Sequence, residues 1–244
     1  MDVAYKGAVM EPVSKKNFGE DECVIHEVEF SVIFRLQHWI RVVAITVLII
    51  SGFYLAYPIL SPTPTNEPTN FMYALFRSWH IIFGFVLISA FMLKVYIFFF
   101  GKMEKRERES FTDIFSFKAW FKQIGYYLLF TKRPKLHGAY NPLQFVAYFM
   151  FYILLIGLIV TGLILYVHVY HEGLGGFLYD PMRAIEVMLG GLATVRELHH
   201  IFMWGVILFI VLHLYLVTFN TVYMKEGAID AIFSGLKWHK KHYK

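Results

Sequence analysis

Residues 196–216, RELHHIFMWGVILFIVLHLYL, decide the fold of this 244-residue chain. The stretch from 198 to 224 contains no Asp, Glu, Lys or Arg. It is long enough for a helix to cross a hydrocarbon core about 30 Å thick. His199 and His213 are 14 residues apart. In a helix this spacing corresponds to about 21 Å along the axis and brings the second side chain to within about 40° of the first. One membrane helix therefore carries an imidazole at each of two depths.

Three more stretches are apolar enough to cross a membrane. The first, 42–66, extends back to about residue 31; the second, 71–100, has one cation near each end; the third, 136–171, has no charged residue. Hydrophobic residues make up 57% of the chain and charged residues only 17%, so we predict an all-α membrane protein, a bundle of four transmembrane helices. The helices are expected at about 31–60, 71–100, 142–168 and 195–222.

Positive charge is distributed unevenly around these helices. Of the 23 Lys and Arg residues, 20 lie before or at the start of the first helix, from Lys94 near the end of the second helix to Lys135, or after the fourth helix. The positive-inside rule then places both termini in the cytoplasm, beneath a bacterial inner membrane. We expect a polar tail (1–30) without a signal peptide, a transmembrane domain (31–224) and a basic cytoplasmic tail (225–244). Charge in separate blocks also argues against binding to nucleic acid.

Two further histidines complete the pattern. His38 lies about two turns into the first helix from its cytoplasmic end, and His80 lies at a similar depth in the second helix from its outer end. Because successive helices run in opposite directions, His38 matches the depth of His213, and His80 matches that of His199. Ionisable groups are rare within a bilayer, and two imidazole pairs in an apolar bundle suit the axial ligation of two b-type haems. A single cysteine, Cys23, excludes an iron–sulfur cluster held by this chain alone.

Other histidines offer alternatives to these four ligands. A lone intramembrane histidine can instead form hydrogen bonds between packed helices. His200 is the nearest competitor of His199, but it lies about 140° from the face of His213. For His168 and His171, which close the third helix, a solvated or interfacial role is favoured. The remaining histidines are expected to be solvated, namely His26, His137, His239 and His242.

Three stretches of the chain resemble one family. RLQHWIRVVAITVLIISGFYL (35–55), RSWHIIFGF (77–85) and residues 196–216 are similar to the di-haem cytochrome b subunit of membrane-bound nickel–iron uptake hydrogenases. The resemblance spans nearly all of the chain after about residue 30. Bacterial cytochrome b561 proteins and the cytochrome b subunit of formate dehydrogenase share the architecture, so formate dehydrogenase or another quinone-linked oxidoreductase is the alternative.

The resemblance implies an electron-transfer subunit with no hydrogen-activating centre of its own. In the family, this subunit anchors a periplasmic pair, an iron–sulfur small subunit and a large subunit, and passes electrons from hydrogen through two haem b groups to menaquinone or ubiquinone. The resemblance also implies four histidines as haem ligands, namely His38, His80, His199 and His213. An alternative from a different class is a non-redox membrane anchor or transporter whose histidines bind a metal or relay protons.

Cations and glycines near the predicted ligands are candidates for supporting roles. Arg35, Arg77 and Arg196 each lie about one turn from a predicted ligand, so their guanidinium groups are candidates to pair with haem propionates. Interfacial anchoring is the alternative. Glycines on the predicted helices would either relieve crowding against a porphyrin or pack helices closely, namely Gly52, Gly84, Gly157, Gly162 and Gly205.

The sequence KLHGAYNPLQ (135–144) indicates a quinone site at the start of the third helix. It resembles the stretch that opens the corresponding helix in related cytochromes b, where the formate dehydrogenase relatives place quinone. Asn141 is a candidate donor to a quinone carbonyl, with His137 or Lys135 assisting proton delivery. The alternative is that Asn141 only caps a helix that begins at Pro142.

Two connections carry weaker predictions. Residues 111–130 alternate apolar and aromatic side chains with lysines, which favours an amphipathic helix in the inner interface. Residues 171–196, on the outer side, are sparsely charged and suit a partner interface, with a lipid-lying or re-entrant segment as the alternative.

Overall fold

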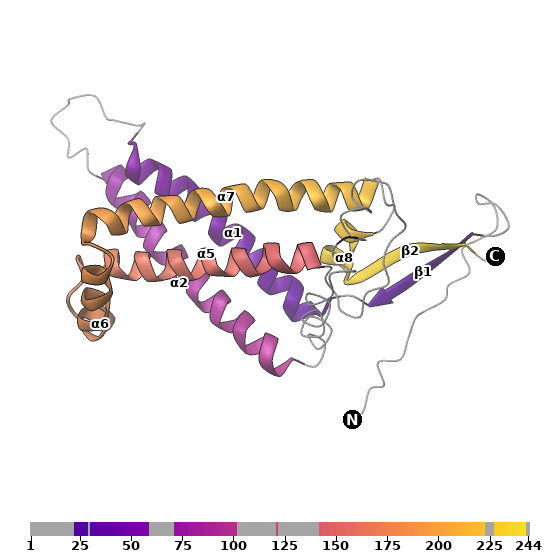
Figure 1. Cartoon of the computed structure of the whole chain (residues 1–244), viewed down its shortest axis with the longest axis horizontal. Helices are drawn as coiled ribbons and strands as arrows, with labels where there is room; N and C mark the ends of the chain where they lie inside the picture. Colours follow the sequence, from indigo (N-terminus) through magenta and orange to yellow (C-terminus); the bar gives the residue numbers. More distant parts are fainter. Residues whose placement is uncertain are drawn as a thin grey trace. The chain divides into compact units, whose positions relative to one another are not determined.

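The computed structural model describes residues 22–28, 30–58, 71–101, 121, 142–222 and 227–242 of the chain. This part is mostly helical, and four of its helices are long and apolar enough to cross a membrane (Figure 1). They are α1 (Val32–Ala56), α2 (Phe71–Phe100), α5 (Pro142–Val167) and α7 (Leu192–Val222). The prediction of a helical membrane protein with four spanning helices is confirmed. The chain also forms one two-stranded sheet, which the all-α prediction did not include.

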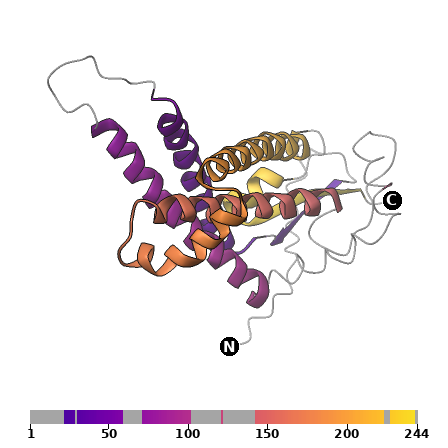
Figure 2. The same ribbon diagram turned by 60° about the vertical axis from the view of Figure 1, so that its left-hand side comes forward.

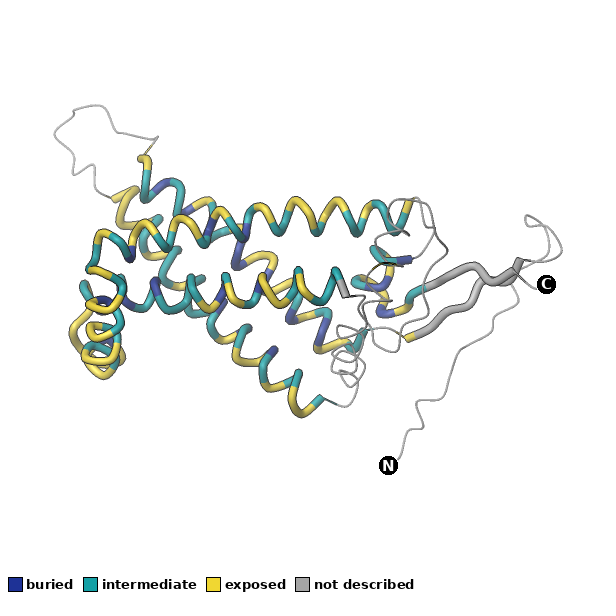
Figure 3. The backbone as a smooth tube through the Cα atoms, in the orientation of Figure 1, coloured by how far each residue is buried: buried dark blue, intermediate teal, exposed yellow. Residues whose placement is uncertain are grey.

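The four long helices follow from the solvent that such apolar segments require. In lipid each backbone N–H and C=O must find its partner within the segment, which a helix provides. Exposed and half-buried residues run along the whole length of these helices (Figure 3), and large apolar side chains such as Ile50, Phe149 and Leu208 are more than half exposed. This surface suits hydrocarbon rather than water.

The chain divides into two compact units, Ile40–Phe209 and the pair of segments Met1–Trp39 and Ile210–Lys244. Within the larger unit, two glycines leave room for large side chains between α5 and α7. A Cβ on Gly157 would lie 2.6 Å from the ring of Phe202, and one on Gly205 would lie 2.9 Å from a methyl of Leu154. Each helix thus offers a glycine to a large side chain of the other, as small residues do where membrane helices pack.

The smaller unit joins the two ends of the chain. Strand β1 (Glu22–Val28) pairs with β2 (Leu236–His242) in an antiparallel ladder that sets Glu22 opposite His242 and Val28 opposite Leu236. Helix α8 (Ala228–Ser234) leads into β2 through Gly235, whose φ of 87° favours glycine. The guanidinium of Arg35 donates to the carbonyl of Phe233 at this turn. Sequence patterning did not predict this ladder between the two polar tails.

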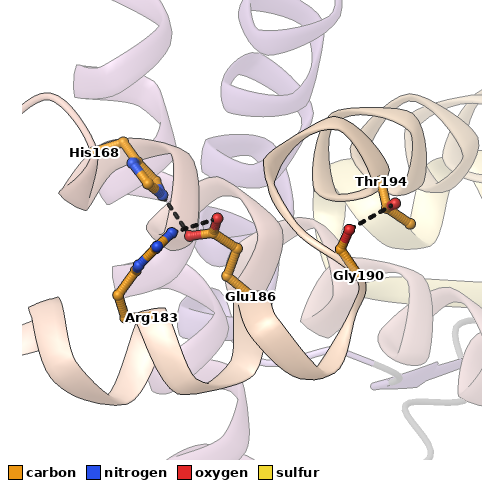
Figure 4. Close-up of polar contacts among 5 residues, drawn as sticks. All are labelled: His168, Arg183, Glu186, Gly190 and Thr194. Atoms are coloured by element: carbon orange, nitrogen blue, oxygen red, sulfur yellow. Dashed lines mark hydrogen bonds and ion pairs between the residues drawn. The ribbon is translucent and has the colours of Figure 1, made fainter.

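Helix α6 (Leu174–Met188) lies between α5 and α7 in the sequence and contacts α5. It is seen nearly end-on in Figure 1 and more along its length in Figure 2, so it lies across the end of α5. The following turn places Gly190 and Gly191 at φ of 92° and 97°, and the hydroxyl of Thr194 donates to the carbonyl of Gly190 at 3.5 Å (Figure 4). The turn therefore needs two glycines before α7 can begin.

A buried carboxylate ties α6 to the end of α5. Glu186 is only 3% exposed, accepts a hydrogen bond from Nε2 of His168, and accepts another from Nη1 of Arg183 at 2.6 Å (Figure 4). The bond from His168, followed by the bond from Arg183, lowers the pKa of Glu186 below its ordinary value of 4.5. His168 thus holds α6 in place rather than standing in solvent.

The lowered pKa predicts that acid loosens α6. A carboxyl group whose pKa is lower in the folded state contributes stability that is complete above its unfolded pKa and is lost as the pH falls through the folded value. We expect Glu186→Gln to reduce the hydrogen-exchange protection of α6 amides roughly tenfold at neutral pH. In the unsubstituted chain the same loss should appear only below about pH 4.5. Equal protection in both chains at neutral pH would contradict this role.

Two sequence predictions lie outside the described residues. The amphipathic helix over 111–130 falls there except for Phe121, and so do the quinone candidates Asn141, His137 and Lys135.

Candidate haem-binding site

The site begins with two histidines that the structure brings together. His80 on α2 and His199 on α7 are partly buried, and their ring centroids lie 6.3 Å apart with the ring planes at 62°. They belong to the same compact unit although 119 positions separate them in the sequence. The two histidines that the sequence places at the same outer depth, His80 and His199, therefore lie next to each other in the structure.

Each imidazole rests against a hydroxyl from a neighbouring helix. Nδ1 of His80 lies 2.9 Å from Oγ of Ser51 on α1, and Nδ1 of His199 lies 2.8 Å from Oγ1 of Thr161 on α5. The two hydroxyl residues are 1% and 2% exposed, respectively. Four helices thus contribute to one site, two with the imidazoles and two with the groups that hold them.

Two of the glycines named from the sequence lie at this site. A Cβ on Gly52 would be 3.3 Å from Cε1 of His80, and one on Gly162 would be 3.4 Å from Cε1 of His199. Gly84, one turn along α2 from His80, has nothing within 4 Å of a Cβ built there. These glycines leave room for the rings and for a group beside them, as a porphyrin requires.

The separation of the imidazoles fits one iron between them. Two imidazoles on opposite sides of a metal, each bound through a nitrogen about 2 Å from it, have ring centroids about 6 Å apart. This matches the 6.3 Å found for His80 and His199. A haem supplies four further nitrogens of its own and needs only two protein ligands.

A bare metal ion fits the pair less well. Among the described residues, no group of three or more His, Cys, Asp or Glu side chains is placed to hold a metal ion. Zinc sites in proteins use three or four such ligands. The geometry therefore favours a cofactor that completes the coordination itself.

The other predicted pair belongs to the smaller unit. His38 lies on α1, next to the ring of Trp39 at 5.5 Å, and His213 lies on α7; both are partly buried. The two belong to the same compact unit. Ligation of a second haem by His38 and His213 stays a prediction.

The three arginines proposed near haem propionates have varied surroundings. Arg35 donates to the carbonyl of Phe233, Arg77 lies over the ring of Tyr170 at 5.9 Å, and Arg196 is exposed. Sequence reasoning passed over Arg41, which is only 8% exposed and donates to the hydroxyl of Tyr152 at 3.0 Å. Its position three residues after His38 on the same helix could have drawn attention to it.

The competing histidines make other contacts. His200 is exposed, and its Nδ1 lies 3.1 Å from the carbonyl oxygen of Arg196. His171 is also exposed, with its ring 5.8 Å from that of Tyr179. Among the described residues, neither has a contact like the one between His199 and Thr161.

A cavity of about 280 Å³ lies between α1 and α2 beside this site. Apolar and aromatic side chains surround it, and Ser51 borders both the cavity and His80. Its lining consists of Val47, Ile50, Ser51, Leu75, Phe76 and Trp79.

Four spanning helices and a partly buried pair of imidazoles are typical of a cytochrome b embedded in a membrane. The model of the family described as prokaryotic cytochrome b561 matches residues 29–235, and the chain belongs to this family. The resemblance predicted from residues 35–55, 77–85 and 196–216 is thereby confirmed.

Several B-type cytochrome subunits of Ni/Fe hydrogenases are similar to this chain over most of their length. A "Probable Ni/Fe-hydrogenase B-type cytochrome subunit" from Azotobacter chroococcum mcd 1 is 31% identical over 213 residues, covering 84% of this chain and 86% of the relative. Its counterpart from Azotobacter vinelandii is 30% identical with the same coverage. A "Probable Ni/Fe-hydrogenase 1 B-type cytochrome subunit" from Escherichia coli (strain K12) is 25% identical over 229 residues, 90% of this chain and 94% of the relative.

Proposed function

We propose that this chain is the membrane anchor and electron-transfer subunit of a Ni/Fe hydrogenase, and that it passes electrons from hydrogen oxidation in the periplasm through two haem b groups to quinone. The pair formed by His80 and His199 carries the proposal, because its spacing fits two ligands of one haem in a chain of the prokaryotic cytochrome b561 family. The names of the relatives favour hydrogenase over formate dehydrogenase as the attached enzyme.

In this proposal His80 and His199 hold an outer haem, and His38 and His213 hold an inner one. When bound, haem b supplies an iron centre that gains and loses one electron. The side chains around it keep water away and fix the two imidazoles. The 14-residue spacing on α7 separates the two sites by about 21 Å along the helix.

The orientation of the chain follows from its charges. Both termini lie in the cytoplasm, beneath the inner membrane of a bacterium, with the polar tail (1–30) and the basic tail (225–244) flanking the transmembrane domain (31–224). Helix α6 then lies on the outer side. Its exposed Phe177 and Met188 suit the docking of the iron–sulfur small subunit of the hydrogenase, and through it the large subunit.

Quinone is proposed to bind at the inner side, near His38 and His213. Asn141, with His137 or Lys135, is the proposed donor set, and menaquinone or ubiquinone is the proposed acceptor. Protons for the quinone would then come from the cytoplasm.

Proteoliposomes carrying the complex with the hydrogenase outside test this arrangement. Each hydrogen molecule oxidised outside releases two protons there, and its two electrons, with two protons from inside, convert quinone to quinol. Hydrogen should therefore drive the interior negative, as reported by a voltage-sensitive dye, and a protonophore should abolish the signal. Quinone reduction without a membrane potential would contradict a quinone site on the inner side and a role for Asn141. The cavity beside Ser51 would then be the alternative quinone site.

A further inference from the structure

A hydroxyl residue followed by a glycine contacts each of the two imidazoles, His80 and His199, in the same way. Ser51 and Gly52 on α1 contact His80 of α2, and Thr161 and Gly162 on α5 contact His199 of α7. In each case the hydroxyl faces Nδ1 and the glycine faces Cε1. Helices α1 and α5 thus carry matching elements for helices α2 and α7.

The hydroxyl hydrogens determine which imidazole nitrogen is protonated. Oγ of Ser51 lies 2.6 Å from the carbonyl oxygen of Val47, and Oγ1 of Thr161 lies 2.6 Å from that of Gly157. A hydroxyl has one hydrogen, and a carbonyl can only accept, so each hydroxyl donates to its own helix. It must then accept from the imidazole, which places the proton on Nδ1.

A neutral imidazole with its proton on Nδ1 has its lone pair on Nε2. Burial excludes water as a competing partner for the hydroxyls, since Ser51 and Thr161 are 1% and 2% exposed. We infer that Ser51 and Thr161 are positioning residues that present Nε2 of His80 and of His199 to a single haem iron. This inference rests on the proposed function, because it takes haem as the ligand.

The glycines let the imidazole rings come within hydrogen-bond distance of the hydroxyls, at 2.9 Å for Ser51 and 2.8 Å for Thr161. A Cβ on Gly52 would lie 3.3 Å from the ring of His80, closer than side chains usually approach. The dipeptide therefore combines an acceptor for Nδ1 with the space that lets the ring approach it. Groups that orient metal-bound histidines in this way typically contribute a factor of about 10–100 to metal affinity.

The chain itself supplies matched control residues for a test. Ser89 and Thr46 are exposed, and their hydroxyls also donate to carbonyls of their own helices, at 2.9 and 2.8 Å. Their substitution removes the same kind of helix bond, and within the described part of the chain neither hydroxyl forms a hydrogen bond with an imidazole.

The experiment measures haem retention and the low-spin EPR signals of the oxidised full-length chain. Ser51→Ala and Thr161→Val should each weaken retention of one haem by about 10–100-fold and change one low-spin signal. Ser89→Ala and Thr46→Val should leave both signals unchanged. Thr161→Ser keeps the hydroxyl and should preserve the signal that Thr161→Val alters.

Unaltered retention and spectra in Ser51→Ala and Thr161→Val would overturn the inference, as would a Thr161→Ser chain altered as strongly as Thr161→Val. Such a result would leave the proposed function standing if His80→Ala still loses one haem. An unsubstituted chain that binds no haem would instead overturn the proposed function itself.

Discussion

Substitution of His199 by alanine is expected to remove one of two haems from the purified chain and to leave the other in place. His80→Ala should have the same effect, because the two imidazoles lie 6.3 Å apart and are proposed to hold the same haem. An apolar bundle would hold a haem weakly once one of its two histidine ligands is lost. A pyridine haemochrome assay should therefore give two haems per unsubstituted chain and one per chain in either variant.

His200→Ala is the control for this experiment. His200 is the immediate neighbour of His199, but it is exposed and its Nδ1 lies against the carbonyl of Arg196. The His200→Ala chain should keep both haems. If His200→Ala rather than His199→Ala removes the outer haem, the assignment from helical phase is wrong.

The second large effect concerns the inner pair. His38→Ala or His213→Ala should remove the other haem and reduce hydrogen-driven quinone reduction to background, because the proposed quinone site lies beside this pair. Reduction of an artificial dye by the attached hydrogenase should persist, since that reaction does not require the inner pair. The measurement compares quinone and dye reduction in the same membranes.

Two outcomes would contradict the inner assignment. One is a chain that keeps two haems and full quinone activity after either substitution. The other is the loss of dye and quinone reduction together, which would show that the variant has lost its hydrogenase and not merely the inner haem.

The sequence was sufficient to predict the spanning helices and the meeting of His80 with His199. Charge-free stretches of about 20 residues have few alternatives to a membrane helix. The depth of each histidine then follows from its distance to the helix end, and the direction of successive helices follows from topology. Both steps use local pattern alone.

The supporting contacts could not be predicted in the same way. A serine or threonine in an apolar helix usually bonds to its own helix, as Ser89 does. Whether its hydroxyl also meets an imidazole depends on how two helices are rotated about their axes, which one sequence does not reveal. Arg35 is a second example: it lies one turn from His38 in the sequence, yet its guanidinium donates to the carbonyl of Phe233 near the end of α8.

The elements outside the four spanning helices also could not be predicted from sequence patterns. The ladder between β1 and β2 joins residues more than 200 positions apart, and both of its strands lie in segments that were expected to be polar tails. For the region of α6 the sequence predicts a sparsely charged connection that suits a partner interface, with a lipid-lying or re-entrant segment as the alternative. The stability of α6 depends on Glu186, whose partner His168 lies beyond the helix itself.

The most direct test of the account is a reduced-minus-oxidised spectrum of the purified full-length chain, combined with a count of haem per chain. We expect the absorption bands of b-type haem at two haems per chain, with low-spin iron as two imidazole ligands require. A chain that is folded in its membrane yet shows no such bands would contradict it.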